Sequence, residues 1–316
     1  MKQRRSIPAI PLLLFCLVIA VSACWGDDGN LKEIGTIAVD DYSACPSMGN
    51  VTGSHFCDGL EDVLAIAGGW TEPLPFPIRN IDATSGQIDG TGTGQNLGDA
   101  VDFFVFTGHA WEAQYNWDYA PGPPNDRDYG AAYRLASQHD HPGNPIPWCE
   151  CNQRDCGNIN HKECRWGNDD NEVVLAYTCQ FLRNLNKQTL LNQIKYMHNR
   201  NHIILGFASN AYFLPSPADA SDFGAYLGWQ LMGHNTPYVK MPFSIIFSWF
   251  EACYMNQPGN TLVRVHYWNG DCFADFLPGN IADEGFGAQP PACTYQNRSQ
   301  FTWLDYRVGD EPYWRL

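Results

Sequence analysis

The sequence lacks three motifs that identify common enzyme classes. It contains no G-x-S-x-G, no H-E-x-x-H and no glycine-rich loop that ends in Gly-Lys followed by Ser or Thr. These absences exclude the serine hydrolases, zinc peptidases and P-loop nucleotide hydrolases that depend on those motifs. We therefore expect no nucleotide cofactor and no catalytic metal ion.

Basic residues are also scarce. The chain has 19 Lys and Arg against 34 Asp and Glu, a formal net charge of −15. Such acidity opposes binding to nucleic acid and adsorption to anionic lipid, so neither is an expected partner. Beyond the N-terminal segment no apolar run reaches the ~18 residues of a membrane span. The nearest run, at 241–255, is too short and contains Glu251.

The N-terminal segment has the pattern of an export signal. A basic start precedes an apolar stretch from Leu12 to Val21, and small residues lead to Cys24. Residues Val21–Cys24 resemble a bacterial lipobox, in which the cysteine is lipidated, although ordinary cleavage after Ala23 fits the same residues. We expect a signal peptide at 1–23 and a single domain at 24–316. The protein would be exported, at the cell envelope or outside the cell, and would contact the membrane through a lipid anchor only.

Cysteine usage agrees with an oxidising compartment. Beyond Cys16 and Cys24, ten cysteines remain: Cys45, Cys57, Cys149, Cys151, Cys156, Cys164, Cys179, Cys253, Cys272 and Cys293. An even count in an exported protein favours disulfides. The natural local pairs are Cys45 with Cys57, Cys272 with Cys293, and two bridges within 149–164, which leaves Cys179 and Cys253.

The four cysteines at 149–164 belong to a long insertion at about 110–170, rich in Pro, Gly, Asn and Asp. A connection of that length is usually functional or held by its own cross-links. His161 lies among these cysteines, so zinc is an alternative, but the spacing lacks the usual C-x2-C pairs. His139 and His141 in the same insertion are expected to be solvated.

Strand and helix patterns alternate along the rest of the chain, which predicts an α/β fold with a mainly parallel sheet and flanking helices. The expected strands lie at 31–42, 76–83, 101–106, 172–177, 202–209 and 261–268, and the expected helices at 57–70, 181–198, 222–232 and 241–255.

Two of these strands end on residues that can do chemistry together. The apolar run at 101–106 ends on Thr107, Gly108 and His109, and the run at 172–177 ends on Thr178 and Cys179. If the strands are neighbours in a parallel sheet, His109 and Cys179 emerge at the same carboxyl edge, where ligands bind. A histidine beside a thiol lowers its pKa and later protonates the leaving amine. We therefore expect Cys179 to be a free thiol of lowered pKa, not bridged to Cys253.

These segments carry a family resemblance. FFVFTGHA resembles the strand–Gly–His motif of caspase-like cysteine peptidases, the group of caspases, legumains, gingipains and clostripain, and VVLAYTCQF occupies the place of their strand–Cys motif. NHIILGFASNAY and FSWFEACY look closer to a little-studied family of exported proteins with that core. The resemblance implies a caspase-like three-layer sandwich and a peptide or protein substrate. It also implies Cys179 as nucleophile, His109 as general acid/base and Gly108 shaping the strand exit.

A second interpretation stays open. The family usually has glycine directly after the histidine and two residues after the cysteine, where this chain has Ala110 and Phe181. This difference favours a non-catalytic surface binding protein on the same fold. Elsewhere, His198 and His202 are expected to serve capping or packing, and Cys253 to be a core thiol or half of a disulfide.

Overall fold

The structure is a computed structural model. It describes residues 32–42, 49–80, 87, 97–113, 132–136, 158–160, 166–167, 171–183, 197–233, 244–268, 275, 291 and 297–312. The expected signal peptide, the segment Val21–Cys24 and most of the insertion lie outside these ranges. No helix within the described ranges combines the length and the apolar character that crossing a bilayer requires.

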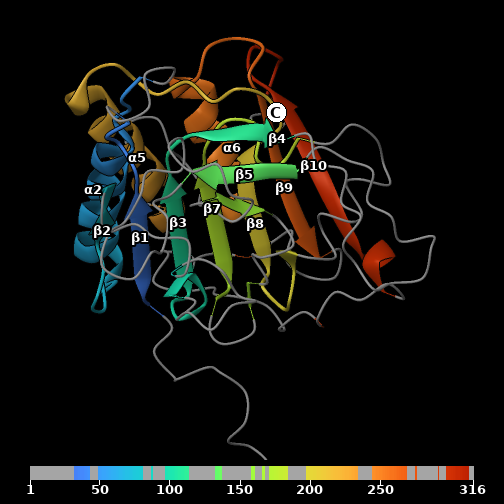
Figure 1. Cartoon of the computed structure of the whole chain (residues 1–316), viewed down its shortest axis with the longest axis horizontal. Coiled ribbons are helices and arrows are strands. Elements are labelled where there is room, and N and C mark those ends of the chain that lie inside the picture. Colours follow the sequence, from blue (N-terminus) through green and yellow to red (C-terminus); the bar gives the residue numbers. More distant parts are fainter. Residues whose placement is uncertain are drawn as a thin grey trace, which may run out of the picture.

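A seven-stranded sheet forms the centre of the fold (Figure 1). Its strands, in the order β10-β9-β8-β7-β3-β1-β2, are Phe301–Arg307, Leu262–Trp268, Ile203–Phe207, Val173–Tyr177, Phe103–Thr107, Ile34–Ala38 and Ile78–Arg79. The five strands β8, β7, β3, β1 and β2 are mutually parallel. Strand β9 pairs antiparallel with β8, and β10 pairs antiparallel with β9. The predicted α/β class with a mainly parallel sheet is confirmed.

The central strands are apolar because both of their faces are buried. All five residues of β1, β3, β7 and β8 are buried. Along β3, Phe103 and Val105 join one core cluster, while Phe104 and Phe106 join the cluster on the opposite face. Strands covered on both faces carry continuous apolar runs instead of an alternating pattern.

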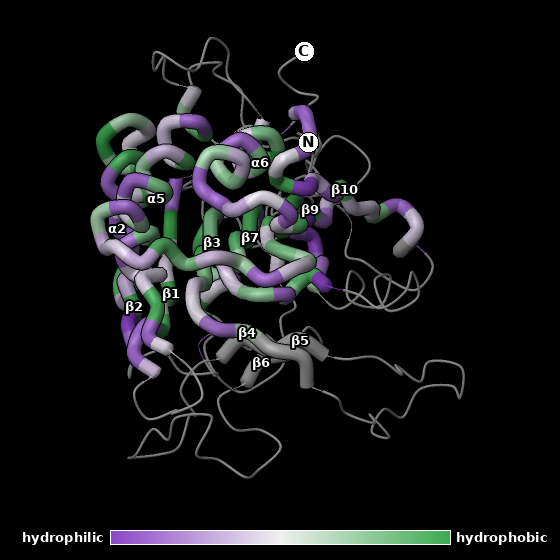
Figure 2. Tube along the Cα trace, turned by 90° about the horizontal axis from the view of Figure 1, so that it is seen from above, coloured by the Kyte–Doolittle hydropathy of each residue, from purple (hydrophilic) through white to green (hydrophobic). Residues whose placement is uncertain are grey.

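Three helices cover one face of the sheet (Figure 2). They are α2 (Gly53–Val63), α5 (Pro217–Met232) and α6 (Ile245–Asn256). A π-helical turn, η1 (Leu64–Gly68), prolongs α2 and ends at Gly69 in the left-handed conformation, where the sequence predicted the end. The helix predicted at 181–198 lies mostly outside the described residues.

Helices α2 and α5 approach each other through glycines. A Cβ atom added at Gly59 would lie 2.1 Å from the carbonyl oxygen of Ser221, and one added at Gly224 would lie 1.9 Å from that of Phe56. Contacts this short with backbone atoms leave no room for a side chain. The two glycines therefore fix how closely α2 packs against α5.

The insertion contains a small sheet that the sequence did not predict. Strand β4 (Ala110–Ala113) follows β3 directly and pairs antiparallel with β5 (Ala132–Ala136), which pairs with β6 (Asn158–Asn160). These strands are short and separated by long polar segments, so their pattern is weak in the sequence. The described part of the insertion is thus partly regular structure instead of loop alone.

Candidate functional site

The two strands that carry the predicted pair are neighbours. β3 and β7 run parallel, and their register pairs Thr107 with Tyr177. His109 and Cys179 each lie two residues beyond this pair, at the carboxyl edge of the sheet. The predicted adjacency of the two strands is therefore confirmed. The side chains of His109 and Cys179 form their hydrogen bonds with backbone carbonyl groups, not with each other.

His109 is held by two residues that precede α2. Its Nε2 lies 2.9 Å from the carbonyl oxygen of Gly49, and its backbone N–H donates to the Tyr42 hydroxyl at 2.8 Å. The ring of Tyr42 also packs edge-on against the imidazole, with centroids 4.5 Å apart. A carbonyl oxygen only accepts, so Nε2 carries the hydrogen and Nδ1 keeps a lone pair.

The ionisation of His109 suits a base. Burial lowers the pKa of the imidazole below 6.5, and the bond to Gly49 opposes this only in part. The ring is therefore neutral at neutral pH. A neutral imidazole with Nδ1 unprotonated can accept a proton from an acidic group.

Gly108 is required by the geometry of the strand exit. Its φ is +152°, and a Cβ atom added there would lie 2.7 Å from the hydroxyl oxygen of Tyr42. That hydroxyl is the acceptor for the backbone N–H of His109. A side chain at position 108 would thus disturb the group that holds the histidine in place.

Cys179 is a free, half-buried thiol. Its Sγ donates to the carbonyl oxygen of Ala211 at 3.5 Å. Cys253 is also free and lies fully buried on α6, so the prediction that these two cysteines are not bridged is confirmed.

The expected lowering of the Cys179 pKa is wrong. Burial raises the pKa of the thiol above 9, and the bond to Ala211 offsets this only in part. No cation contributes to the shift. The resting pair is therefore a neutral thiol and a neutral imidazole instead of a thiolate and an imidazolium.

A loop after β8 connects the two strand ends. Phe213 stacks on Tyr177, with ring centroids 4.6 Å apart, and packs edge-to-face against His109, with ring centroids 6.2 Å apart. The Tyr177 hydroxyl donates to the carbonyl oxygen of Tyr212 at 2.6 Å, and Gln257 donates to the same oxygen at 2.9 Å. These contacts order the loop that accepts the hydrogen bond of Cys179.

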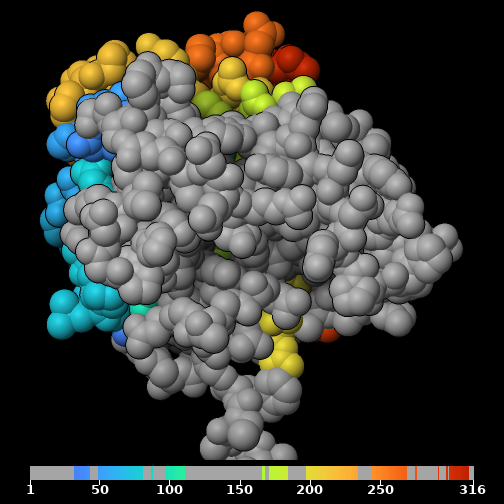
Figure 3. Space-filling model, viewed as in Figure 1, coloured from blue at the N-terminus to red at the C-terminus, as the bar shows by residue number. Residues whose placement is uncertain are grey.

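A pocket of about 540 Å³ opens beside Cys179. Its lining comes from the segments after β7, after β8 and before β9: Gln180, Arg183, Ala208, Ser209, Asn210, Ala211, Tyr212, Pro258, Gly259, Asn260 and Thr261. The same three segments, coloured yellow-green, yellow and orange, meet along the top edge of the molecule in Figure 3. Arg183 is the charged residue among them, and the others offer amides, hydroxyls and backbone groups.

Gln180 joins the pocket to the candidate nucleophile. It directly follows Cys179 and adopts a φ of +59°, which is unusual for a residue other than glycine. Its backbone N–H donates to Ser209 at 2.8 Å, and its side chain bonds to both Asn210 and Arg183. Strained backbone held by several bonds is typical of functional sites.

The remaining histidines of the sequence analysis have structural roles where they are described. His198 and His202 are both buried. His202 lies between two carboxylates, with Nε2 3.0 Å from Glu172 and Nδ1 2.6 Å from Asp275. The burial of both rings agrees with the expected packing, while the buried contacts of His202 with two carboxylates were not predicted from the sequence. His139, His141 and His161 lie outside the described ranges.

One expected disulfide is contradicted. Cys57 is free and fully buried on α2, with Sγ 3.9 Å from the Thr107 hydroxyl. The inner face of the amphipathic helix points it into the core, so the pairing of Cys45 with Cys57 is wrong. Cys272, Cys293 and the four cysteines of the insertion lie outside the described ranges. Within those ranges no three His, Cys, Asp or Glu residues gather to hold a metal ion.

Sequence reasoning missed Tyr42, Gly49 and Phe213. Tyr42 had a signal, because it follows β1 at the same edge at which His109 follows β3. Gly49 acts through a backbone carbonyl that any residue could supply. Phe213 is distant in the sequence, and its contacts appear only when β8 is placed beside β7.

Comparison with known proteins gives one family. Residues 81–285 match the family model described as Domain of unknown function (DUF6345). The match includes β3, β7, β8, α5, α6 and β9, and with them both His109 and Cys179. No curated protein matches the sequence.

Proposed function

The chain belongs to the DUF6345 family, and we propose that it is an exported cysteine peptidase with a caspase-like sandwich fold. Cys179 is the nucleophile, His109 is the general acid/base, and a peptide or protein is the substrate. The proposal rests on one observation. Thr107 and Tyr177 are paired in the adjacent parallel strands β3 and β7, and His109 and Cys179 each follow two residues later, at the same edge of the sheet.

The reaction begins from neutral groups. As the Cys179 sulfur attacks the scissile carbonyl carbon, Nδ1 of His109 takes the thiol proton, and an oxyanion forms on the carbonyl oxygen. The imidazolium then protonates the leaving amine, the C–N bond breaks, and an acyl thioester remains. Water, deprotonated by the same imidazole, hydrolyses the thioester and restores the thiol. Gly49 keeps Nε2 protonated throughout, because Nε2–H donates to its carbonyl oxygen, so only Nδ1 gains and loses a proton.

The pocket beside Cys179 offers a place for a substrate side chain. Ala211 both accepts the thiol hydrogen bond and lines the pocket, so a side chain there would belong to a residue near the scissile bond. Arg183 and the surrounding amides suit a polar or acidic side chain better than a basic one. A substrate panel should therefore vary the charge of this residue.

A second function, peptide binding without hydrolysis, is favoured by one observation. Two backbone N–H groups near the pair already have internal acceptors, since Gln180 donates to Ser209 and His109 donates to Tyr42. Loss of a single oxyanion donor costs about 10²–10³ in rate. A surface protein that holds peptides without cleaving them would retain the fold and the pocket without needing these donors.

Hydrolysis assays on purified mature chain distinguish the two functions. We expect cleavage of quenched fluorogenic peptides, and a loss of about 10³-fold or more in kcat/KM for both Cys179→Ala and His109→Gln. Cys253→Ala and His55→Gln are matched controls, because Cys253 is a second free thiol, fully buried on α6, and His55 is a half-exposed histidine on α2. Peptide binding without turnover in the wild-type chain would favour the second function.

A further inference from the structure

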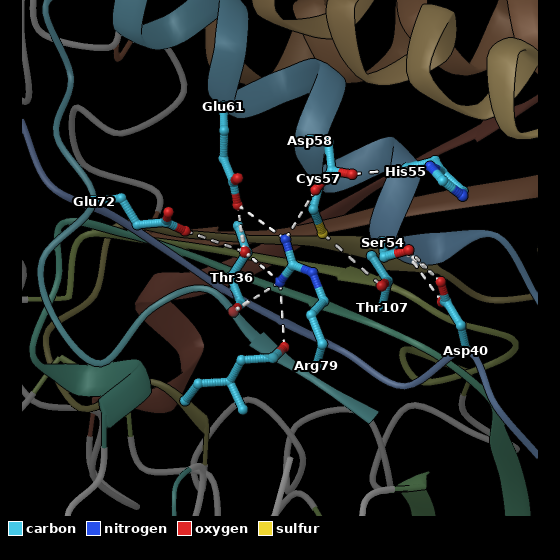
Figure 4. A network of polar contacts seen from close by, with 11 residues as sticks. Thr36, Asp40, Ser54, His55, Cys57, Asp58, Glu61, Glu72, Arg79 and Thr107 are labelled. Atoms are coloured by element: carbon cyan, nitrogen blue, oxygen red, sulfur yellow. Dashed lines mark hydrogen bonds and ion pairs between the residues drawn. The ribbon is translucent and has the colours of Figure 1, made fainter. Parts of the chain in front are cut away.

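A cluster of carboxylates lies at the other end of α2, away from the candidate site. Glu61 on α2 and Glu72 in the turn before β2 both approach the hydroxyl of Thr36, which lies in the middle of β1 (Figure 4). Thr36 is fully buried. Arg79 on β2 is the cation of the cluster, and Asp58 on α2 is its further carboxylate.

The hydrogen bonds of Thr36 can be counted. Its hydroxyl accepts from Nη1 of Arg79 at 2.8 Å and donates a short hydrogen bond to Oε1 of Glu61. A hydroxyl has one proton to donate. The contact with Oε1 of Glu72, at 3.5 Å, therefore lacks a proton unless Glu72 brings its own.

The charges lead to the same conclusion. Arg79 lies 3.1 Å from Asp58 and 3.6 Å from Glu61, and Glu72 joins the same cluster through Thr36. One guanidinium therefore has to balance three carboxylates when all of them are ionised. Cys57 faces the cluster from α2 as a neutral buried thiol, and His55 pairs with Asp58 at its exposed side. A single proton shared by the two glutamates halves this excess negative charge.

We propose that Glu61 and Glu72 share one proton. This shared-proton contact, called the latch below, holds the turn that carries Glu72 against helix α2 and depends on pH. The turn is also tied to the start of β1, since Thr71 donates to Lys32 and accepts from Ile34, both at 2.9 Å. Opening the latch loosens the point at which the described chain enters the sheet.

The pH range follows from the position of the proton. Burial, and next the negative charge of Glu61, raise the pKa of Glu72 to about 7 from 4.5. The folded state then binds this proton more tightly than the unfolded chain does. The latch is complete below pH 4.5, and its contribution is lost as the pH rises through about 7.

Stability at two pH values tests the latch in the full mature chain. Glu72→Gln keeps the shape of the side chain and cannot ionise. At pH 8.5 we expect its unfolding equilibrium constant, measured in urea, to lie about tenfold below that of the wild type, while at about pH 4, where the latch is complete, the two should agree. The full pKa shift of Glu72 would change the unfolding equilibrium constant about 300-fold. The half-exposed position of Glu72 reduces this effect, because solvent screens the charges.

Two further measurements keep the test decisive. At pH 8.5 the Thr71 amide should exchange with solvent about tenfold faster in wild type than in Glu72→Gln. Glu61→Gln should also remove the pH dependence, because it removes the repelling charge, and it serves if Glu72→Gln fails to fold. Asp62→Asn, an exposed change on the same helix, should leave the pH dependence unchanged. Equal pH dependence in wild type and both glutamine variants would overturn the proposal.

Discussion

Removing one oxygen atom from Tyr42 tests how the candidate base is held. Tyr42 is 2% exposed, and its hydroxyl accepts the backbone N–H of His109. Tyr42→Phe keeps the ring that packs against the imidazole and deletes the hydroxyl that accepts this hydrogen bond. An N–H left without a partner in a buried site costs about 1–3 kcal/mol, so the variant should lose stability in that range.

The same oxygen limits what can stand at position 108. A Cβ atom at Gly108 would lie 2.7 Å from it, while the next nearest atoms, the carbonyl oxygen of Val39 and a ring carbon of Phe106, are 3.3 and 3.4 Å away. Gly108→Ala alone should cost about 1–3 kcal/mol, through this overlap and through the positive φ of +152° at this position. In the Tyr42→Phe background the overlap disappears, so Gly108→Ala should cost at least ~1 kcal/mol less there.

Urea unfolding of the four proteins in this double-mutant cycle measures the coupling. Gly69→Ala is the matched control, because Gly69 also has positive φ but has nothing within 4 Å of an added Cβ, so its cost should be independent of Tyr42. If the free-energy costs of Gly108→Ala and Tyr42→Phe add to within ~0.5 kcal/mol in the double variant, the proposed geometry of the strand exit is refuted.

Three other predictions concern packing, pH and anchoring. Gly224→Ala should destabilise the fold by about 2 kcal/mol or more in urea unfolding and Gly228→Ala by less, because the former meets the backbone of α2 and the latter meets a side chain. The rate of peptide hydrolysis should rise with pH to a plateau whose midpoint lies below 6.5, since burial lowers the pKa of His109; a midpoint above 6.5 would contradict a neutral resting imidazole. Intact mass of protein isolated from membranes should show a lipid-modified Cys24 at its N-terminus, and an unmodified cysteine there would contradict the anchor.

Sequence patterns located most of the large sheet because its strands are buried on both faces. β3 and β7 stand out as apolar runs, and their adjacency follows from a parallel sheet in which the strands lie close in chain order. β10 was missed, although it pairs along its whole length with β9. Its middle residues are only partly buried, so the segment carries no continuous apolar run.

The chemistry of the pair was less predictable than its position. A thiolate requires a cation or dipole close to the sulfur, and sequence shows neither burial nor distance. Burial raises the pKa of Cys179, whereas the sequence suggested a lowering. In the same way, the spacing of Cys45 and Cys57 suggested a disulfide, while helix α2 points Cys57 inward.

Covalent labelling by a peptide-derived electrophile tests the central claim most directly. The mature chain is treated with peptidyl acyloxymethyl ketones that carry an acidic, a neutral or a basic residue next to the reactive carbon, and the adduct is located by mass spectrometry. The account predicts one adduct, on Cys179, that depends on the peptide and is lost in His109→Gln. An unlabelled Cys179, or labelling that is unchanged in His109→Gln, would contradict it.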